Sequence, residues 1–299
     1  MDDLPSVAGQ LIAITRPVQK RCPAAVFSVL PFPPQSFILI LKIRFDYTEP
    51  DRSRYTMKAF SHSVTGSTLK ILAVITMFLD HIGACVFEHG LLRMEAIRAD
   101  ETLYLFLKNT DQILRLIGRV AFPIFCFLLV EGFLHTSNRK KYALRLFLFA
   151  LISEIPFDLA IRGSFFDIQY QNVYFTLLIG LLVMMLCDYF QKSFPAQLAI
   201  LAGGLLLALA LHTDYSYKGV MLIELLYLFR CDRRKQIVAG GLSFCWELTA
   251  PLAFIPIWHY NGKRGLSLRW FFYWFYPIHL LLLWAFTTCL LPLLTAGIL

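Results

Sequence analysis

The stretch Lys70–Gly83, KILAVITMFLDHIG, decides how this chain folds. It begins as a long apolar run and then places Asp80 and His81 side by side. Ionisable residues inside a membrane-type helix are costly, so such a pair indicates a functional site. At about 1.5 Å per residue, His81 lies roughly 16 Å beyond Lys70 along a helix. If Lys70 marks one membrane surface, His81 sits near the middle of a hydrocarbon core about 30 Å thick.

The composition extends this interpretation to the whole chain. Hydrophobic residues make up 58% and charged residues 16% of the 299 residues, and the apolar residues fall in long runs. An ordinary soluble domain does not need that much apolar surface. We therefore predict an all-α fold, a polytopic helical membrane bundle in contact with lipids. Much of the net charge of +8 lies in short loops beside the runs, where it sets orientation, so no nucleic-acid partner is expected.

The apolar runs predict eight transmembrane helices. The sixth is the weakest, because it is short and contains Lys218 and Glu224, and a count of seven is the main alternative. The predicted ranges are Leu69–Phe87, Ile113–Leu134, Tyr142–Ile161, Val173–Phe190, Phe194–Leu211, Tyr215–Phe229, Gln236–Trp258 and Trp270–Leu294.

Residues 1–56 differ from the rest of the chain. Their apolar part is broken by Pro31, Pro33 and Pro34, which disfavours a spanning helix. We interpret 1–56 as a poorly ordered or peripheral tail, or as an upstream over-extension with Met57 as the natural start. The integral-membrane domain then comprises residues 57–299.

Loop charges orient the predicted bundle. Arg139–Lys141 and Arg230–Lys235 fall on one side of an eight-helix arrangement, as do Lys58, Lys70 and Lys192. Positive loops stay cytoplasmic, so both termini of a multi-pass membrane protein are expected inside. One loop argues against this arrangement. The loop carries Lys263, Arg264 and Arg269, yet the eight-helix arrangement places it outside. There it would face a substrate or anionic headgroups.

His81 is the first candidate for chemistry. A neutral imidazole can take a proton from a hydroxyl or an amine near neutral pH. The alternative is a core histidine that is bonded to a neighbouring helix. Asp80 cannot easily orient His81, because successive helix residues point about 100° apart. We expect Asp80 to pair with a cation on another helix instead.

Arg115 and Arg119 share one helix face at i, i+4. Arg119 could neutralise Asp80 or hold an anionic group with two hydrogen bonds. The alternative is that these arginines extend from the helix end to the membrane interface. Glu131 lies near the inner end of the same predicted helix. It is a candidate binding residue, and the alternative is a helix-end carboxylate that is simply solvated.

Glu154 and Asp158 also share a face, and Pro156 between them bends the helix. Facing inward, the two carboxylates would hold a proton, a cation or a substrate amine. The alternative is an ion pair with an arginine that stabilises the bundle. Tyr276 and His279 lie beside a proline in the last predicted helix, where His279 either lines the same site or is a packing residue.

Several familiar motifs are missing from the sequence. It contains no GxGxxG, Walker, GxSxG or HExxH motif, and its seven cysteines show no CxxC or zinc spacing. Neither a nucleotide-binding fold nor a metal site is therefore expected.

Several stretches of residues 57–299 resemble the TraX family. They are Thr76–Gly83, Gly118–Phe133, Phe149–Asp158, Asp214–Gly219 and Tyr276–His279. The founding member is the conjugative pilin acetylase, which acetylates the N-terminus of pilin. The family is similar to a wider group of membrane acyltransferases, the acyltransferase-3 and heparan-glucosaminide acetyltransferase types. Those enzymes carry a basic residue shortly before a functional histidine, and Lys70 and His81 match that spacing, with Lys in place of the usual Arg.

The resemblance implies an acyltransferase of the bacterial inner membrane, in which His81 and Asp80 are catalytic. Acetyl-CoA or another acyl-CoA would enter from the lysine-rich side, and no metal is implied. The acceptor would be a peptide amine or a hydroxyl of an envelope glycan. His81 would act as general base or as acyl carrier. The residues expected to bind donor or acceptor are Lys70, Arg119, Glu131, Glu154, Asp158, Tyr276 and His279.

Two other classes of protein are alternatives. A proton- or cation-coupled transporter would use Asp80, Glu154 and Asp158 as ion sites, although the two halves show no symmetry of the kind many transporters have. A non-catalytic assembly factor of a conjugation or secretion system is the other. Uptake by proteoliposomes without acyl-CoA would indicate the first class. Unchanged partner function in a His81→Ala variant would indicate the second.

Overall fold

The computed structural model describes residues 24–25, 45–46, 63–267 and 269–295. The chain divides into two compact units, Met1–Phe60 and Ser61–Leu299. In the first unit, the strands β1 (Ala24–Ala25) and β2 (Phe45–Asp46) pair antiparallel. The rest of the stretch predicted to be a tail, 1–56, lies outside the described residues.

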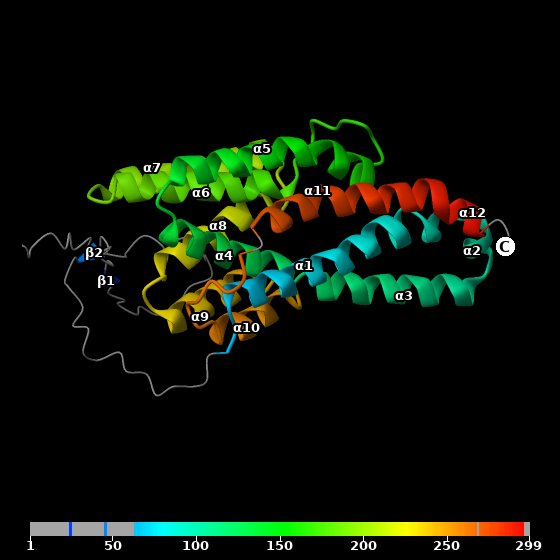
Figure 1. Ribbon diagram of the computed structural model, residues 1–299, viewed down its shortest axis with the longest axis horizontal. Helices are drawn as coiled ribbons and strands as arrows, with labels where there is room; N and C mark the ends of the chain where they lie inside the picture. The colour runs from blue at the N-terminus through cyan, green and yellow to red at the C-terminus, as the bar shows by residue number, and fades with distance from the viewer. Residues whose placement is uncertain (1–23, 26–44, 47–62, 268, 296–299) are drawn as a thin grey trace, which may run out of the picture. The chain divides into compact units, whose positions relative to one another are not determined.

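The described part of the second unit consists mainly of helices (Figure 1). Helices satisfy their own backbone hydrogen bonds, which suits long apolar segments. The α-helices are α1 (Gly66–Ile82), α2 (Glu95–Ala99), α3 (Glu101–Gly118), α4 (Ala121–His135), α5 (Arg139–Phe157), α6 (Val173–Tyr189), α7 (Phe194–Ala210), α8 (Ser216–Leu228), α9 (Arg233–Ser243), α10 (Phe254–Trp258), α11 (Arg269–Ala285) and α12 (Leu291–Thr295). Short π- or 3₁₀-helical pieces are Gly83–Glu88, Leu91–Arg93, Asp158–Arg162, Ala250–Ala253 and Phe286–Leu290.

Among the described residues, three helical segments are long and apolar enough to cross a membrane. They are Gly66–Arg93, Glu101–His135 and Trp270–Thr295, and α6 and α7 are shorter apolar helices. Large apolar side chains are exposed on these segments, including Ile75, Leu206 and Leu282. Such a surface suits lipid better than water. The helical membrane fold predicted from the apolar runs is confirmed to this extent.

Polar residues begin several of these helices. The first N–H groups of a helix have no partner within it, and a side-chain oxygen just before the helix can accept from them. The residues that do so here are Thr65 for α1, Asn138 for α5, Asn172 for α6 and Asp232 for α9. These caps explain why the helices start where the polar loops end.

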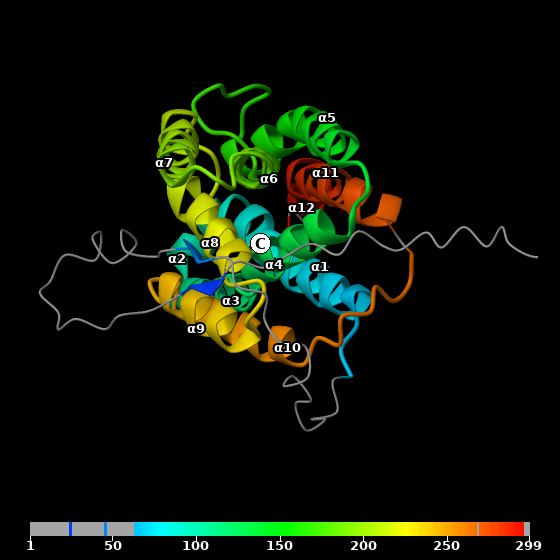
Figure 2. The same ribbon diagram turned by 90° about the vertical axis from the view of Figure 1, so that its left-hand side faces the viewer.

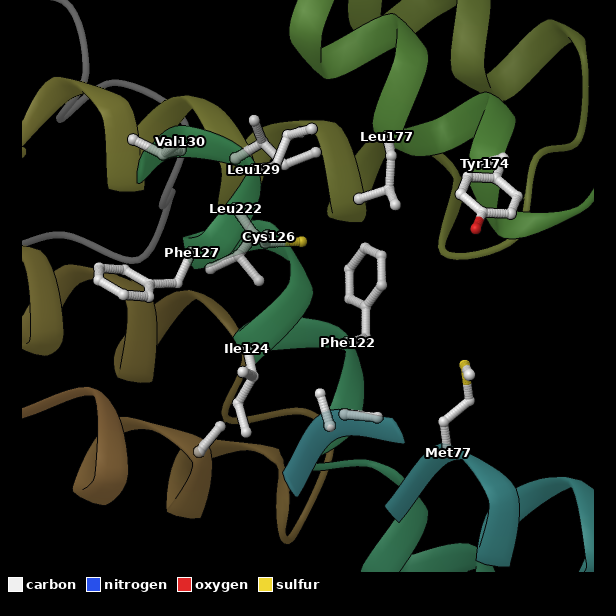
Figure 3. Packing of buried hydrophobic residues seen from close by; sticks show 14 of the residues in the cluster. Met77, Phe122, Ile124, Cys126, Phe127, Leu129, Val130, Tyr174, Leu177 and Leu222 are labelled. Atoms are coloured by element: carbon white, nitrogen blue, oxygen red, sulfur yellow. The ribbon is translucent and has the colours of Figure 1, made fainter. Parts of the chain in front are cut away.

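Helix α4 lies within the described bundle and contacts α1, α6, α8 and α10 (Figure 2). Helix α11 packs against α1 and α5, and α8 also packs against α6, α7 and α9. A close view of the core shows α4 side chains between neighbouring helices (Figure 3). The labelled core residues include Met77 of α1, Phe122, Ile124 and Phe127 of α4, Leu177 of α6 and Leu222 of α8.

The predicted transmembrane helix Gln236–Trp258 is not one helix, which corrects the eight-helix arrangement. Helix α9 ends at Ser243, and a turn region and a 3₁₀ piece lead into α10. Between the two arms the chain bonds to another helix, because the Thr249 hydroxyl donates to the Leu116 carbonyl. Pro251 lacks an N–H and lies in the first turn of the 3₁₀ piece, where none is needed.

This segment, residues 236–258, is a hairpin whose two ends meet. The Arg233 guanidinium, just before it, lies 5.5 Å from the centroid of the Tyr260 ring, just after it. Arg233 also lies 4.7 Å from the centroid of the Phe127 ring on α4. The tip of the hairpin reaches further along the bundle, where Glu247 pairs with Arg119 at 3.3 Å. The hairpin therefore leaves and returns at the same end.

The loop after the hairpin packs against the start of α1. The N–H of Gly66 donates to the Lys263 carbonyl at 2.8 Å, and that of Ser67 to the Arg264 carbonyl at 2.9 Å. Gly265 has a φ of 71°, and an added Cβ would lie 2.1 Å from the Ser67 hydroxyl, so the close approach requires glycine. The basic loop that an eight-helix count places outside thus lies beside the first turn of α1.

Candidate histidine site

The structure brings together two predicted site residues, His81 of α1 and His279 of α11. Nδ1 of His81 lies 2.6 Å from Nε2 of His279. The ring centroids are 4.9 Å apart and the ring planes are inclined by 22°, so the two rings meet through these nitrogens. His279 is only 3% exposed, whereas His81 is partly exposed. Of the two residues, His81 is the more exposed.

Aromatic rings surround the histidine pair. Tyr276 makes edge contacts with both imidazoles, each at 5.9 Å between centroids. Phe275 stacks on His279 at 4.6 Å, and Phe78 of α1 makes an edge contact with it at 6.0 Å. Such surroundings favour the neutral form of an imidazole over the charged form. The predicted residue Tyr276 therefore lies in the site together with His81 and His279.

Pro277 links the bend in α11 to the wall of this site. Proline has no N–H, so the carbonyl of Tyr273, four residues earlier, loses its usual helical donor. The hydroxyl of Tyr174, at the start of α6, donates to this carbonyl at 3.2 Å. Tyr174 also makes an edge contact with Tyr276 at 5.2 Å. The proline thereby helps to hold α6 against the histidine site.

Asp80 points toward α3, as the geometry of successive helix residues predicts. Its carboxylate accepts from the Arg115 guanidinium at 2.6 Å. The expected partner Arg119 instead pairs with Glu247 and is hydrogen-bonded to Tyr215. Gly118 explains the close approach of α3 to α1, because an added Cβ would lie 2.2 Å from the Cβ of Asp80. The prediction that Asp80 pairs with a cation on another helix is confirmed, but the cation is Arg115 and not Arg119.

Arg115 serves more than one carboxylate. Its Nε lies 3.4 Å from the Glu88 carboxylate, beside the contact with Asp80. Glu88 follows the apolar run in the π-helical turn, and Glu247 lies at the hairpin tip. Neither residue has an obvious partner in the sequence. The spacing of Asp80 and Glu88, two helical turns apart, was the available signal for Glu88.

Glu154 and Asp158 bind to the connection between α5 and α6. Asn172 donates a hydrogen bond to the Glu154 carboxylate and another, at 2.8 Å, to the Ala150 carbonyl. The Asp158 carboxylate accepts the N–H of Asp167 at 2.7 Å. The ion pairs with arginine considered from the sequence are not seen for these two residues within the described part. Asn172 was missed, although an asparagine directly before an apolar run is a usual helix cap.

Glu131 and Lys70 lie at the end of the bundle where the hairpin begins. Glu131 lies 3.9 Å from the Arg233 guanidinium and is hydrogen-bonded to Tyr260. Burial, and then the nearby Glu131, raise the pKa of the Tyr260 hydroxyl to about 12. The ammonium group of Lys70 lies 5.5 Å from the centroid of the Phe272 ring. These predicted residues belong to the end of the bundle, away from the histidine pair.

Asp214 lies in the loop before α8, near the guanidinium of Arg119. Burial raises the pKa of the Asp214 carboxyl to about 6, although the Tyr170 hydroxyl and Arg119 oppose this shift. The Tyr170 hydroxyl donates to the carboxylate at 3.3 Å. The loop between α5 and α6 is thus tied to the loop between α7 and α8. Within the described residues, no group of three or more histidine, cysteine or acidic residues is placed to hold a metal ion.

The long apolar helices indicate a helical membrane protein, and the histidine pair lies between two of these helices. The chain belongs to the TraX protein family, whose model matches residues 65–287. It is 30% identical over 245 residues to the probable fimbrial assembly protein FimC, serogroup H1, of Dichelobacter nodosus. That match covers 72% of this chain and 92% of the relative. No solved structure matches the chain.

Proposed function

We propose that this protein is an integral-membrane acyltransferase that moves an acetyl or similar group from acyl-CoA to a pilin-type protein. The observation that carries the proposal is the setting of His81. Its imidazole lies in an apolar, membrane-length helix and contacts a second imidazole and an aromatic ring. An imidazole kept neutral in this way can act as a general base. Family membership and the fimbrial relative support a pilin-related role.

The acyl transfer would proceed through His81 as general base. The acceptor amine or hydroxyl attacks the thioester carbonyl, and its proton passes to His81 as the new C–N or C–O bond forms. The C–S bond then breaks, and the leaving thiolate takes the proton from His81 and departs as a thiol. Tyr276 packs on both imidazoles and keeps them in place. The Asp80–Arg115 pair next to His81 keeps the neighbouring carboxylate away from the imidazole.

The hairpin supports a seven-crossing arrangement. The crossings would be α1, α3 with α4, α5, α6, α7, α8 and α11, while residues 236–258 enter and leave at one end. The loops with Arg139–Lys141, Arg230–Lys235 and Lys263–Arg264 then share one face, as the positive-inside rule demands of a cytoplasmic face. An odd number of crossings puts the start of α1 and the end of α12 on opposite sides. The donor would enter from the basic face.

Cysteine labelling tests this arrangement. In a background without the native cysteines, Lys140→Cys and Lys263→Cys are expected to resist a membrane-impermeant maleimide in right-side-out vesicles and to react once the membrane is opened. Phe166→Cys, in the loop between α5 and α6, is expected to react in sealed vesicles, because Phe166 is 60% exposed and the proposed arrangement puts this loop on the opposite face. Labelling of Lys263→Cys in sealed vesicles would instead support eight crossings.

Mass spectrometry tests the acyl transfer. We expect pilin-type proteins from cells with the gene to carry an acyl mass that is missing from cells without it, and the mass returns when the gene is restored. The purified protein in nanodiscs should release free thiol from acyl-CoA only when the acceptor is present. Unchanged masses of pilins, exported peptides and envelope glycans in cells without the gene would contradict the proposal.

A second candidate function is a non-catalytic role in pilus assembly. It is favoured by the name of the fimbrial relative, which describes assembly rather than catalysis. A His81→Gln variant tests whether assembly depends on acyl transfer. Pili that assemble normally without the acyl mass would show that another part of the protein supports assembly. The transporter class stays a prediction, and Glu154 and Asp158 have bonds within the α5–α6 connection.

A further inference from the structure

A backbone carbonyl orders the ring nitrogens of the histidine pair. Nδ1 of His279 lies 2.6 Å from the carbonyl oxygen of Phe275, one helical turn earlier. A carbonyl oxygen can only accept a hydrogen bond, so Nδ1 of His279 carries the proton. In the neutral ring this leaves Nε2 of His279 without a proton. That nitrogen can therefore only accept.

His81 supplies the donor for Nε2 of His279. The contacting atom of His81 is Nδ1, at 2.6 Å. Because the His279 nitrogen accepts, the proton between the two rings belongs to Nδ1 of His81. The other nitrogen of His81, Nε2, then carries a free lone pair. One carbonyl oxygen thus determines the protonation of four ring nitrogens.

A charged His279 would reverse this order, but the site opposes it. The ring of His279 is 3% exposed and lies against Phe78, Phe275 and Tyr276. A buried charge without an opposite charge beside it is costly. The carboxylate of the preceding residue, Asp80, is paired with Arg115, and the Arg115 guanidinium acts on His81 with a positive charge. A positive charge on His279, in addition to that of Arg115, is therefore disfavoured.

We propose that His279 is a positioning residue that holds His81 in the tautomer with Nε2 free. Nε2 of His81 is then the atom that takes the proton from the acceptor, so the inference rests on the proposed acyl transfer. The buried His279 does not touch the substrate. It occupies the place that a carboxylate has behind the histidine of a serine hydrolase triad. A neutral imidazole does this without placing a charge in the apolar core.

Nitrogen NMR tests the tautomer without any acyl transfer. In ¹⁵N-histidine protein in nanodiscs, the signals that disappear in His81→Gln should show a protonated Nδ1 and an unprotonated Nε2. In His279→Phe, which keeps a ring but removes the acceptor, the His81 proton is expected to move to Nε2. The matched control is His89→Phe, because Nδ1 of His89 also lies 2.6 Å from a backbone carbonyl, that of Ala84. It should leave the His81 signals unchanged.

Rates of acylation test the positioning role. The partner that orients a metal-binding histidine is typically worth about 10- to 100-fold in activity, and we expect a loss of that order in His279→Phe. His279→Gln should recover most of the rate, because its side-chain carbonyl can accept from Nδ1 of His81. His89→Phe should acylate at the normal rate. If His279 acted through packing alone, the His279→Phe and His279→Gln variants would instead lose the same fraction of the rate.

The outcomes separate this inference from the proposed function. A protonated Nε2 on His81 in the unaltered protein would overturn the tautomer, whether or not the protein acylates. Unchanged His81 signals in His279→Phe would overturn the role of His279. A free Nε2 in a protein that transfers no acyl group would support the tautomer and contradict the acyltransferase.

Discussion

Replacing His81 by Gln is expected to lower the rate of acyl transfer by about 10²- to 10⁴-fold, the usual contribution of a positioned general base. Glutamine keeps a polar side chain of similar length, but its amide cannot take a proton near neutral pH. The contact with His279 can persist, because the amide can donate to Nε2 of that ring. The measurement is thiol release from acyl-CoA by the purified protein in nanodiscs, together with the acyl mass on the acceptor.

The control for this prediction is His89→Gln. His89 is a histidine of the same helical segment, and its ring bonds to the Ala84 carbonyl. It should keep the normal rate. Both variants need the same unfolding midpoint as the unaltered protein, so that a loss of rate is not a loss of fold. Normal acylation by a folded His81→Gln variant would remove His81 from the chemistry, whatever other activity the protein has.

The apolar runs allowed the helical membrane class and most helix positions to be predicted. They could not reveal the hairpin at residues 236–258, because a hairpin in an apolar environment needs the same composition as a spanning helix. The signal was electrostatic: Lys263 and Arg264 fell on the wrong side of an eight-helix count. That conflict does not arise in the proposed seven-crossing arrangement, in which the loop lies beside Gly66 and Ser67 at the start of α1.

Local geometry predicted part of the site, and packing decided the rest. The angle between successive helix residues sent Asp80 away from His81 and toward a cation. Arg115 and Arg119 lie on one face, and the prediction named Arg119 as the partner of Asp80, which was wrong. The choice follows from the close approach of α3 at Gly118, which is a property of the folded pair of helices.

The contact of His81 with His279 lies further beyond sequence reasoning, because 198 positions separate the two residues. Each histidine alone is as easily explained as a packing residue. Only the packing of α11 on α1 shows which nitrogens meet. The role of Pro277 is similar, because the sequence predicts a bend there, but not that Tyr174 occupies the carbonyl that the bend frees.

Replacing Arg115 by Met is expected to lower the free energy of unfolding by somewhat less than the roughly 3–5 kcal/mol of a fully buried pair, since loss of one partner leaves a largely buried charge uncompensated. The Asp80 and Arg115 side chains are only 18% and 24% exposed, and one Asp80 oxygen already lacks a partner within the described structure. The thermal or denaturant midpoint in a defined detergent measures this loss. The control is Arg162→Met, because Arg162 pairs with Asp167 at 2.9 Å but is 42% exposed. Water replaces that partner, so little change is expected.

The double variant Asp80→Asn with Arg115→Met shows whether the loss comes from the charge. Asparagine has nearly the shape of aspartate but no charge, so the double variant should be more stable than Arg115→Met alone. The recovery would identify Arg115 as the residue that makes a carboxylate tolerable beside the histidine site. Equal stability of the single and double variants would mean that Arg115 acts through its packing on Gly83 instead, where its side chain is close.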